Sequence, residues 1–257
     1  MKRAACLLLA LCAALCPPGA CLGETAEVVV FAAASLTETL TQIAGDYKAV
    51  APDVTLVFNF DSSGTLKTQV EEGAECDLFL SAAPKQMDEL EALGFVDADS
   101  RMNLLENKVA LAVPDGNPAG IASFDDLAAR LRAGDVLLAV GNSDVPVGQY
   151  TQRIFAYCGL DAEALAGCLT YGSNVKEVAA QVREATVDCG VIYATDAASA
   201  GLAVVDTATG EMCGQVIYPA AVLSVARRPD AARAFLDYLA GDAAGAVFAD
   251  LGFAPLT

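Results

Sequence analysis

Serine hydroxyls follow two of the apolar strands that the sequence predicts, and they are well suited to hold an anion. Ser35 follows the run VVVFAAA at 28–34, and Ser62 and Ser63 follow the apolar segment 54–60. Helical spacing of apolar residues begins directly after each turn. A strand that ends at a helix N-terminus presents unpaired N–H groups and the positive end of the helix dipole. Hydroxyls and amides at such turns can bind an anion without a charged side chain.

Each serine also has an ordinary structural interpretation. Ser35 followed by Glu38 fits a capping box that opens a helix over 35–50, and Ser62 or Ser63 fits a helix N-cap. The same junction of a strand with a helix start recurs along the chain, and this recurrence favours an anion site over helix capping alone.

The same strand-to-helix junction recurs three more times in the second half of the chain. Pro146 suits the first turn of a helix and leaves the amide of Val147 free. Asn174 is a natural N-cap, which exposes the amide of Val175 in the next first turn. The apolar segment 189–193 ends in Tyr193, whose alternative role is to pack between lobes. Backbone amides and one phenol therefore extend the set of candidate donors.

Strands and helices alternate along the chain with short connections, which predicts an α/β fold with parallel sheets covered by helices on both faces. Ligands bind such sheets beyond the carboxyl ends of the strands, where all the turns described above lie. The length after the N-terminal segment favours two lobes over one. We expect lobe I over 24–106 and 221–257 and lobe II over 107–220. The chain should cross between them near 106–108 and near 218–221.

Composition limits the classes of function. The chain has 257 residues, a net charge of −18 and no histidine. Such an acidic protein has no long-range attraction for nucleic acid or anionic lipid. Without histidine, and without an SxxK pair at Ser35 or Ser63, a serine hydrolase lacks its base. Without a CxxC motif, a zinc site is not expected either, and we expect no cofactor. An adhesion or scaffold module is a further alternative, in which the recurring turns are coincidental.

The N-terminus has the regions of a secretory signal over 1–23. Lys2 and Arg3 precede an apolar run that is too short to span a bilayer, and small residues follow it. Cys21 after Gly-Ala is similar to the lipidation site of bacterial lipoproteins, although Pro18 stands where leucine is usual. Lipidation and simple cleavage both remain open. Five cysteines lie beyond this segment, and Cys158 and Cys168 flank a short loop that makes them the favoured disulfide pair.

Five segments, in order and spacing, resemble the periplasmic molybdate-binding component of ABC importers. They are FAAASL at 31–36, FDSSGTL at 60–66, DLFLSA at 77–82, VPVGQY at 145–150 and GVIYATDA at 190–197. The resemblance extends from about residue 28 to the C-terminus. It implies a type II periplasmic solute-binding fold, with two Rossmann-like lobes and a ligand cleft between them.

The resemblance also implies a ligand and the groups that hold it. The family binds molybdate or tungstate through neutral donors, which fall here on Ser35, Ser63, Val147, Val175 and Tyr193. It implies an exported monomer, periplasmic or lipid-anchored, that delivers the oxyanion to a membrane permease and is not an enzyme. A receptor for sulfate or phosphate on the same fold is the alternative.

Two acidic residues depart from the family pattern. Asp61 lies beside the serine turn and Asp144 lies close to the proposed Val147 amide. A carboxylate that faces the cleft would repel a dianion, so we expect both side chains to point to solvent.

Overall fold

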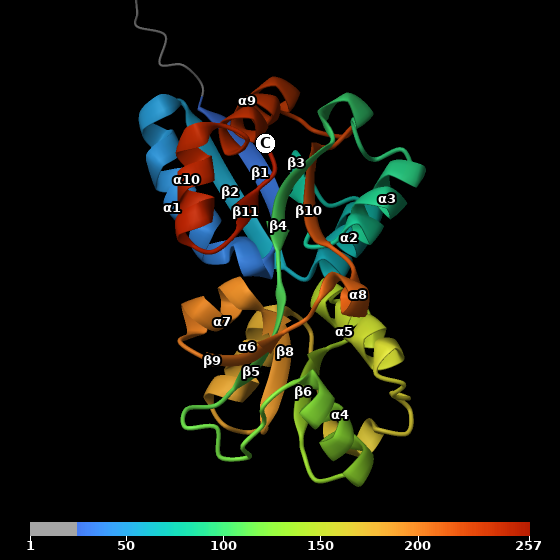
Figure 1. The fold of residues 1–257 in the computed structure, drawn as a ribbon. Helices are drawn as coiled ribbons and strands as arrows, with labels where there is room; N and C mark the ends of the chain where they lie inside the picture. The colour runs from blue at the N-terminus through green and yellow to red at the C-terminus, as the bar shows by residue number, and fades with distance from the viewer. Residues whose placement is uncertain (1–24) are drawn as a thin grey trace, which may run out of the picture.

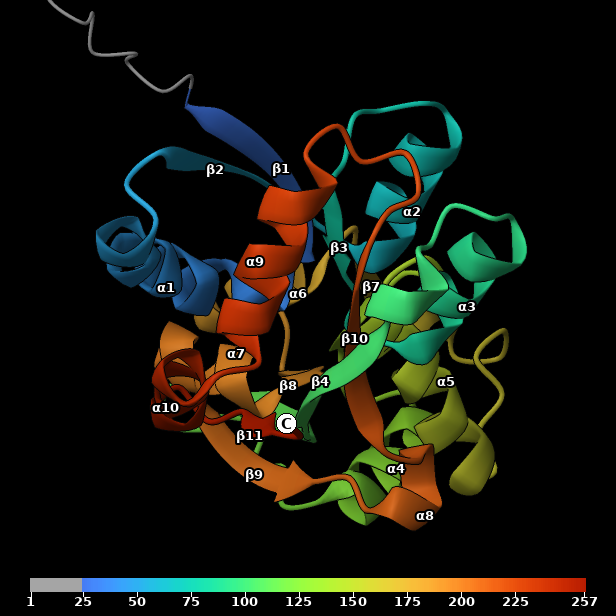
Figure 2. The ribbon, with the colours of Figure 1, turned by 90° about the horizontal axis from the view of Figure 1, so that it is seen from above.

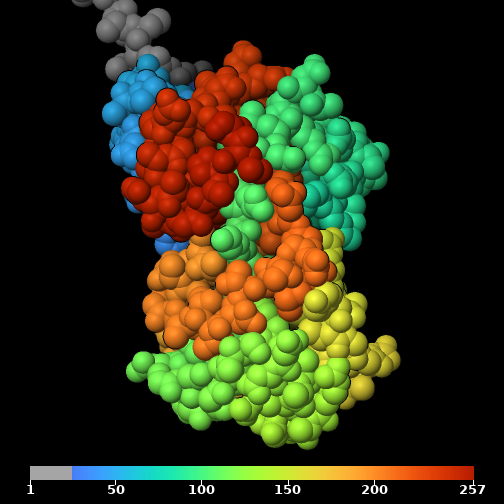
Figure 3. Space-filling model, viewed as in Figure 1, coloured from blue at the N-terminus to red at the C-terminus, as the bar shows by residue number. Residues whose placement is uncertain are grey.

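The computed structural model describes residues 25–257, which form two lobes, each built on one β-sheet (Figure 1). The expected signal segment and Cys21 lie outside the described residues. No helix within residues 25–257 has the length and apolar character needed to cross a membrane. The space-filling view shows the two lobes in contact across their junction (Figure 3).

The larger lobe contains a six-stranded sheet. Its strands, in spatial order, are β11 (Ala254–Pro255), β4 (Met102–Asn107), β10 (Val216–Val222), β3 (Leu78–Leu80), β1 (Ala26–Ala33) and β2 (Val54–Asp61). β1 is parallel to both neighbours, and Val30 is in register with Phe58 of β2 and Leu78 of β3. The carboxyl ends of these three strands therefore meet at one edge of the sheet.

Helices cover both faces of this sheet, which explains why its inner strands β1 and β3 are mostly apolar. These helices are η1 (Ala34–Leu36), α1 (Thr37–Val50), α2 (Ser63–Glu71), α3 (Pro84–Ala92), η2 (Ala98–Ser100), α9 (Pro229–Leu239) and α10 (Asp242–Asp250). Successive side chains of a strand point to opposite faces. Val30 packs in the core with α1 and α9, while Phe31 packs in a second cluster with α2 and α3. Figure 2 shows these two helical layers on either side of β1 and β3.

The smaller lobe contains a five-stranded sheet. Its strands, in spatial order, are β7 (Leu169–Gly172), β6 (Leu138–Gly141), β8 (Cys189–Tyr193), β5 (Val109–Val113) and β9 (Ala203–Thr207). Its helices are α4 (Phe124–Ala133), α5 (Pro146–Tyr157), η3 (Ala166–Cys168), α6 (Val175–Arg183), α7 (Ala194–Ala200) and α8 (Gly210–Cys213). β6, β7 and β8 are parallel, and their carboxyl ends face the larger lobe (Figure 1).

The prediction of wholly parallel sheets is wrong, because the strands at the lobe junction are antiparallel to their neighbours. β4 runs out toward the smaller lobe and continues through Lys108 into β5, whereas β10 returns beside it in the opposite direction. β10 is thus antiparallel to β3 and β4, and β5 is antiparallel to β8 and β9.

The chain leaves the larger lobe where expected but returns earlier than expected. β10 pairs with β4 and β3 along its length, so the return lies between Thr207 and Val216 and not at 218–221. The lobe boundaries given above remain predictions. The expected disulfide is absent: Cys158 and Cys168 are both free, half-buried thiols.

Candidate functional site

A small cavity lies between the lobes, at the carboxyl ends of the parallel strands. The space inside it that is open to a water-sized sphere is about 10 Å³. The larger lobe lines it with Ala33, Ala34, Ser35, Asp61, Ser62, Ser63 and Ala82, and the smaller lobe with Val145, Pro146, Val175 and Tyr193. The structure therefore brings together four of the five residues predicted to bind the anion. Their role as ligands remains a prediction.

Ser63 and Tyr193 reach the cavity from opposite lobes and meet at Ala82. The N–H of Ala82 donates to Ser63 Oγ over 3.0 Å, which leaves the serine hydrogen free to point elsewhere. The Tyr193 hydroxyl donates to the carbonyl of Ala82 over a long 3.4 Å. Ser62, and not Ser63, caps α2: its Oγ accepts from the amide of Thr65 at 3.1 Å. Capping thus accounts for Ser62 but not for Ser63.

Ser35 does not form the expected capping box. It lies inside the 3₁₀ turn η1, and the N-cap position of α1 is Leu36, which provides no side-chain cap. The Ser35 hydroxyl is instead 3.0 Å from the hydroxyl of Tyr218 on β10. Glu38 turns away to the other lobe, where it accepts a hydrogen bond from Lys176. The extra 3₁₀ turn moves the helix start by two residues and releases the serine from a capping role.

Three helix N-termini surround the cavity. Val175 is the first residue of α6 and lines the cavity, with Asn174 as its N-cap. Val147 is the second residue of α5; it is fully buried, and its neighbours Val145 and Pro146 line the cavity in its place. Ser63 is the first residue of α2. First-turn amides have no acceptor within their own helix, and each helix start carries about half a positive charge. These helix starts therefore contribute a positive potential at the cavity.

The charged side chains at the cavity are few. None of the described residues that line it is basic, and Asp61 is its single acidic residue. The expectation that Asp61 points to solvent is wrong: its Oδ1 accepts from the amide of Ser62 at 2.7 Å and from Asn174 Nδ2, in the other lobe, at 3.3 Å. These two donors hold the carboxylate at the cavity wall. Asp144 is exposed and outside the cavity lining, as expected.

Burial keeps the phenols at the lobe junction protonated. It raises the pKa of Tyr193 and of Tyr218 well above the ordinary value. The neighbouring carboxylate of Asp196 raises the pKa of both further. Both side chains are consequently neutral hydroxyl donors across the physiological pH range.

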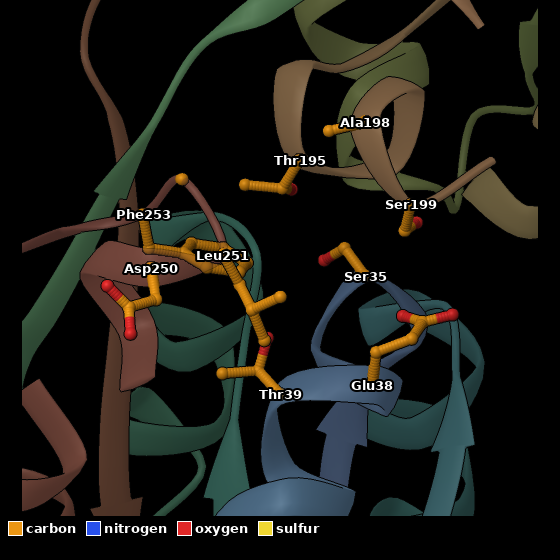
Figure 4. A pocket seen from close by; sticks show the side chains of 10 residues that line it. Ser35, Glu38, Thr39, Thr195, Ala198, Ser199, Asp250, Leu251 and Phe253 are labelled. Carbon is orange, nitrogen blue, oxygen red and sulfur yellow. The ribbon is translucent and has the colours of Figure 1, made fainter. Parts of the chain in front are cut away.

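Ser35 also forms the wall of a second, larger cavity, in which about 200 Å³ is open to a water-sized sphere. Figure 4 shows Ser35 between Glu38 and Thr39 of α1 and Thr195 and Ser199 of α7. The opposite side is closed by Leu251 and Phe253 of the C-terminal segment. Two carboxylates, Glu38 and Asp250, line this cavity, so it is less suited to an anion than the smaller one. Within residues 25–257 no group of His, Cys, Asp and Glu is arranged to hold a metal ion.

The lobes are held closed by contacts that the sequence did not predict. Lys176 of α6 forms ion pairs with Glu38 in the other lobe, at 2.7 Å, and with buried Asp196, at 3.0 Å. Gly64 of α2 lies against the Asp144 carbonyl, and a Cβ at position 64 would be 2.2 Å from that oxygen. Charge pairing and a close backbone approach thus accompany closure.

Asn107 and Tyr218 were also missed. Asn107 donates to Tyr218 from the end of β4. Nothing in the sequence places Tyr218 of β10 beside Ser35. The contact between Gly64 and Asp144 did have a signal in the sequence. Gly64 lies in the Ser-Ser-Gly turn, and a glycine near a helix start can mark a close approach of another backbone segment.

Asp196 gives a testable pH dependence of stability. Its side chain is buried, neither carboxylate oxygen has a well-oriented hydrogen bond, and the ion pair with Lys176 compensates it only partly. Burial raises its pKa from 3.8 to about 6, so the folded state binds the proton more tightly than the unfolded state. Protonation of Asp196 therefore stabilises the folded state fully below about pH 4, and this stabilisation is lost as the pH rises through 6.

We therefore predict that Asp196→Asn gains stability relative to the wild type between pH 4 and pH 6. The gain should be up to about 3 kcal/mol, since one pKa unit corresponds to about 1.4 kcal/mol. Urea unfolding of both proteins at pH 4, 5, 6 and 7 measures it. Parallel stability curves would show that Asp196 does not titrate in this range.

Comparisons with known proteins agree with this geometry. The family described as bacterial extracellular solute-binding protein matches residues 28–254. The molybdate-binding protein ModA of Haemophilus influenzae is 35% identical over 234 residues, which cover 89% of this chain and 90% of that protein. These matches span both lobes.

Two solved structures show the same arrangement of elements. The periplasmic molybdate-binding protein of Azotobacter vinelandii superposes with a TM-score of 0.76 at 20% identity, covering 88% of this chain and 98% of that one. The sulfate-binding protein SubI of Mycobacterium tuberculosis has a TM-score of 0.76 at 18% identity, covering 90% and 87%. At these identities the likeness establishes the fold, and the predicted type II solute-binding fold is confirmed. Together with the match along residues 28–254, it places the chain in the family of bacterial extracellular solute-binding proteins.

Proposed function

We propose that this protein captures molybdate, and also tungstate, in the interlobe cavity and delivers it to the membrane permease of an ABC importer. The observation that carries the proposal is the composition of the cavity wall. It combines hydroxyl groups with the starts of three helices and has no basic side chain among the described residues that line it. The relative from Haemophilus influenzae, whose name states molybdate binding, supports the choice of anion.

The chemistry of the anion fits such a wall. Molybdate and tungstate carry two negative charges and no proton near neutral pH, so they only accept hydrogen bonds. The hydroxyls of Ser35 and Ser63 and the amides of Val147 and Val175 are donors. The Tyr193 hydroxyl joins them when its hydrogen turns from the Ala82 carbonyl, 3.4 Å away, to the anion. Hydrogen bonds to a charged group contribute about 1.5–3 kcal/mol each, so a handful of them offsets the cost of removing water from the dianion. Protonated phosphate would place its own hydrogen against a donor.

The same wall argues against an enzyme. Ser63 Oγ accepts from the amide of Ala82, and the sequence contains no histidine that could take its proton. A hydroxyl held in this way binds but is not activated as a nucleophile. We infer that the protein acts as an exported monomer, free in the periplasm or lipid-anchored through Cys21, and needs no cofactor.

The ligand can be identified by calorimetric titration of the mature protein with molybdate, tungstate, sulfate and phosphate, without added metal. We expect tight one-to-one binding of molybdate and tungstate and at least 100-fold weaker binding of sulfate and phosphate. Sulfate is smaller, so fewer donors reach it at once. Preference for sulfate would assign the protein to sulfate uptake on this fold. Absence of detectable binding with all four anions would contradict the proposal.

Removal of single hydroxyls tests the donors. Ser63→Ala and Tyr193→Phe should each raise the Kd for molybdate about tenfold or more, since each removes a hydrogen bond to a charged group. Matched controls lie outside the cavity lining: Ser123→Ala removes the N-cap of α4, and Tyr150→Phe removes a buried phenol. The controls should bind within twofold of the wild type. Unchanged affinity in both test variants would exclude these side chains as ligands.

Closure of the lobes can be tested at Gly64. Gly64→Ala places a methyl group 2.2 Å from the carbonyl oxygen of Asp144 in the closed form, closer than any real contact. The lobes must then stay further apart, and we expect the Kd for molybdate to rise at least tenfold. Gly45→Ala on α1 is the control, because a Cβ there meets nothing within 4 Å. Equal affinity of the two variants would show that binding does not need the closed form.

A further inference from the structure

We propose that Asn107 and Tyr218 are positioning residues that force the Ser35 hydroxyl to donate into the anion cavity, and that they thereby favour anions without a proton. The inference rests on the proposed function and adds the origin of its selectivity. The three side chains form a chain of hydrogen bonds in which each link sets the direction of the next. Asn107, Tyr218 and Ser35 are all buried, so water does not compete for these links.

The chain begins at Asn107, whose side-chain amide has a fixed orientation. Its Oδ1 accepts from the backbone N–H of Lys108 at 2.8 Å, so this atom is the oxygen and the other is the nitrogen. Nδ2 then donates its two hydrogens, one to Thr195 Oγ1 at 2.9 Å and one to the Tyr218 hydroxyl at 3.2 Å. Asn107 therefore acts on Tyr218 as a donor and cannot accept from it.

The Tyr218 hydroxyl accepts from Asn107 and donates to Ser35 in turn. It keeps its proton, because burial raises its pKa well above the ordinary value. The oxygen already accepts from Asn107, and Ser35 Oγ, at 3.0 Å, is close enough to accept the phenolic hydrogen. The rings of Tyr193 and Phe253, with centroids 5.7 and 5.5 Å away, pack against the Tyr218 ring. In the reverse direction the Tyr218 hydrogen would have neither Asn107 nor Ser35 as its acceptor.

Ser35 is the last link. With its oxygen accepting from Tyr218, its own hydrogen is free to donate, and Ser35 lines the anion cavity. A free serine hydroxyl can rotate and offer either a hydrogen or a lone pair. A serine whose oxygen accepts from Tyr218 offers only its hydrogen. It can therefore donate to an unprotonated oxyanion oxygen, but it cannot accept the hydrogen of a protonated one. The selectivity of the cavity thus depends on residues that do not line it.

Two substitutions change the direction in different ways. In Asn107→Asp the carboxylate accepts from Tyr218, which turns the phenolic hydrogen away and makes Ser35 donate to Tyr218 instead of to the anion. In Tyr218→Phe the constraint is absent and Ser35 rotates freely. The control for added charge is Asn103→Asp, an exposed position on the same strand, and the control for loss of a phenol is Tyr150→Phe.

The test compares sulfate with hydrogen phosphate at pH 8, both measured by displacement of molybdate. The two anions are close in size and both are mostly dianions at this pH, so their affinity ratio isolates the effect of one proton. We expect both test variants to raise the Kd for molybdate at least tenfold. Both should also shift the phosphate-to-sulfate affinity ratio at least fivefold toward phosphate, with the larger shift in Asn107→Asp. The controls should stay within twofold of the wild type.

A merely structural role for the two residues predicts a different result. Affinity would then fall for all anions while the ratio stays within twofold of the wild type, and that outcome overturns the proposal. Neutron diffraction of the wild type tests the direction without any ligand. Deuterium of Tyr218 on the line to Ser35 supports the proposal, and deuterium of Ser35 on that line overturns it. If no oxyanion binds the wild type, the proposed function fails, and the neutron result still decides the direction of the link.

Discussion

The structure depends on one constraint: among the described residues, the cavity between the lobes is lined by donors but by no cationic side chain that could hold an anion. Such a wall has to be assembled from groups that are far apart in the sequence, since no single helix start supplies enough of them. The parallel strands of the two sheets bring three helix N-termini to one point. Each amide in a first turn lacks an acceptor in its own helix and so points its hydrogen outward. The alternation of strands and helices thus brings neutral hydrogen-bond donors together at one site.

The same constraint explains where the charges have gone. Lys176 directly follows Val175, one of the cavity residues, so a cation is within a residue of the site. Its ammonium is paired with Glu38 and Asp196, away from the cavity lining. Burial opposes the charge of Lys176, but the two carboxylates outweigh it and raise its pKa. The ion pairs therefore hold the two lobes together and keep the Lys176 ammonium out of the cavity lining.

The sequence was sufficient for features that depend on local pattern. Pro146 and Asn174 lie at the helix starts expected of them, because a missing N–H and a capping amide act within one turn. The sequence was insufficient where distant strands decide the outcome. Ser35 fits a capping box with Glu38 by spacing alone, yet Tyr218 and Lys176 are better partners in three dimensions. The antiparallel strands β4 and β10 have no local signal that tells them from parallel ones, so Asn107 and Tyr218 could not be placed at the site.

These two residues also link the cavity to the strands that join the lobes. Asn107 ends β4 immediately before the chain crosses into β5, and Tyr218 lies on the returning strand β10. The pairing of β10 with β4 shifts register between Tyr218 and Pro219, and such a bulge re-aims a side chain. Asn107 further donates to Thr195 in the smaller lobe. A hinge motion that displaced β4 from β10 would break the links to Ser35, so a donor-only serine and a closed cleft are two consequences of one geometry.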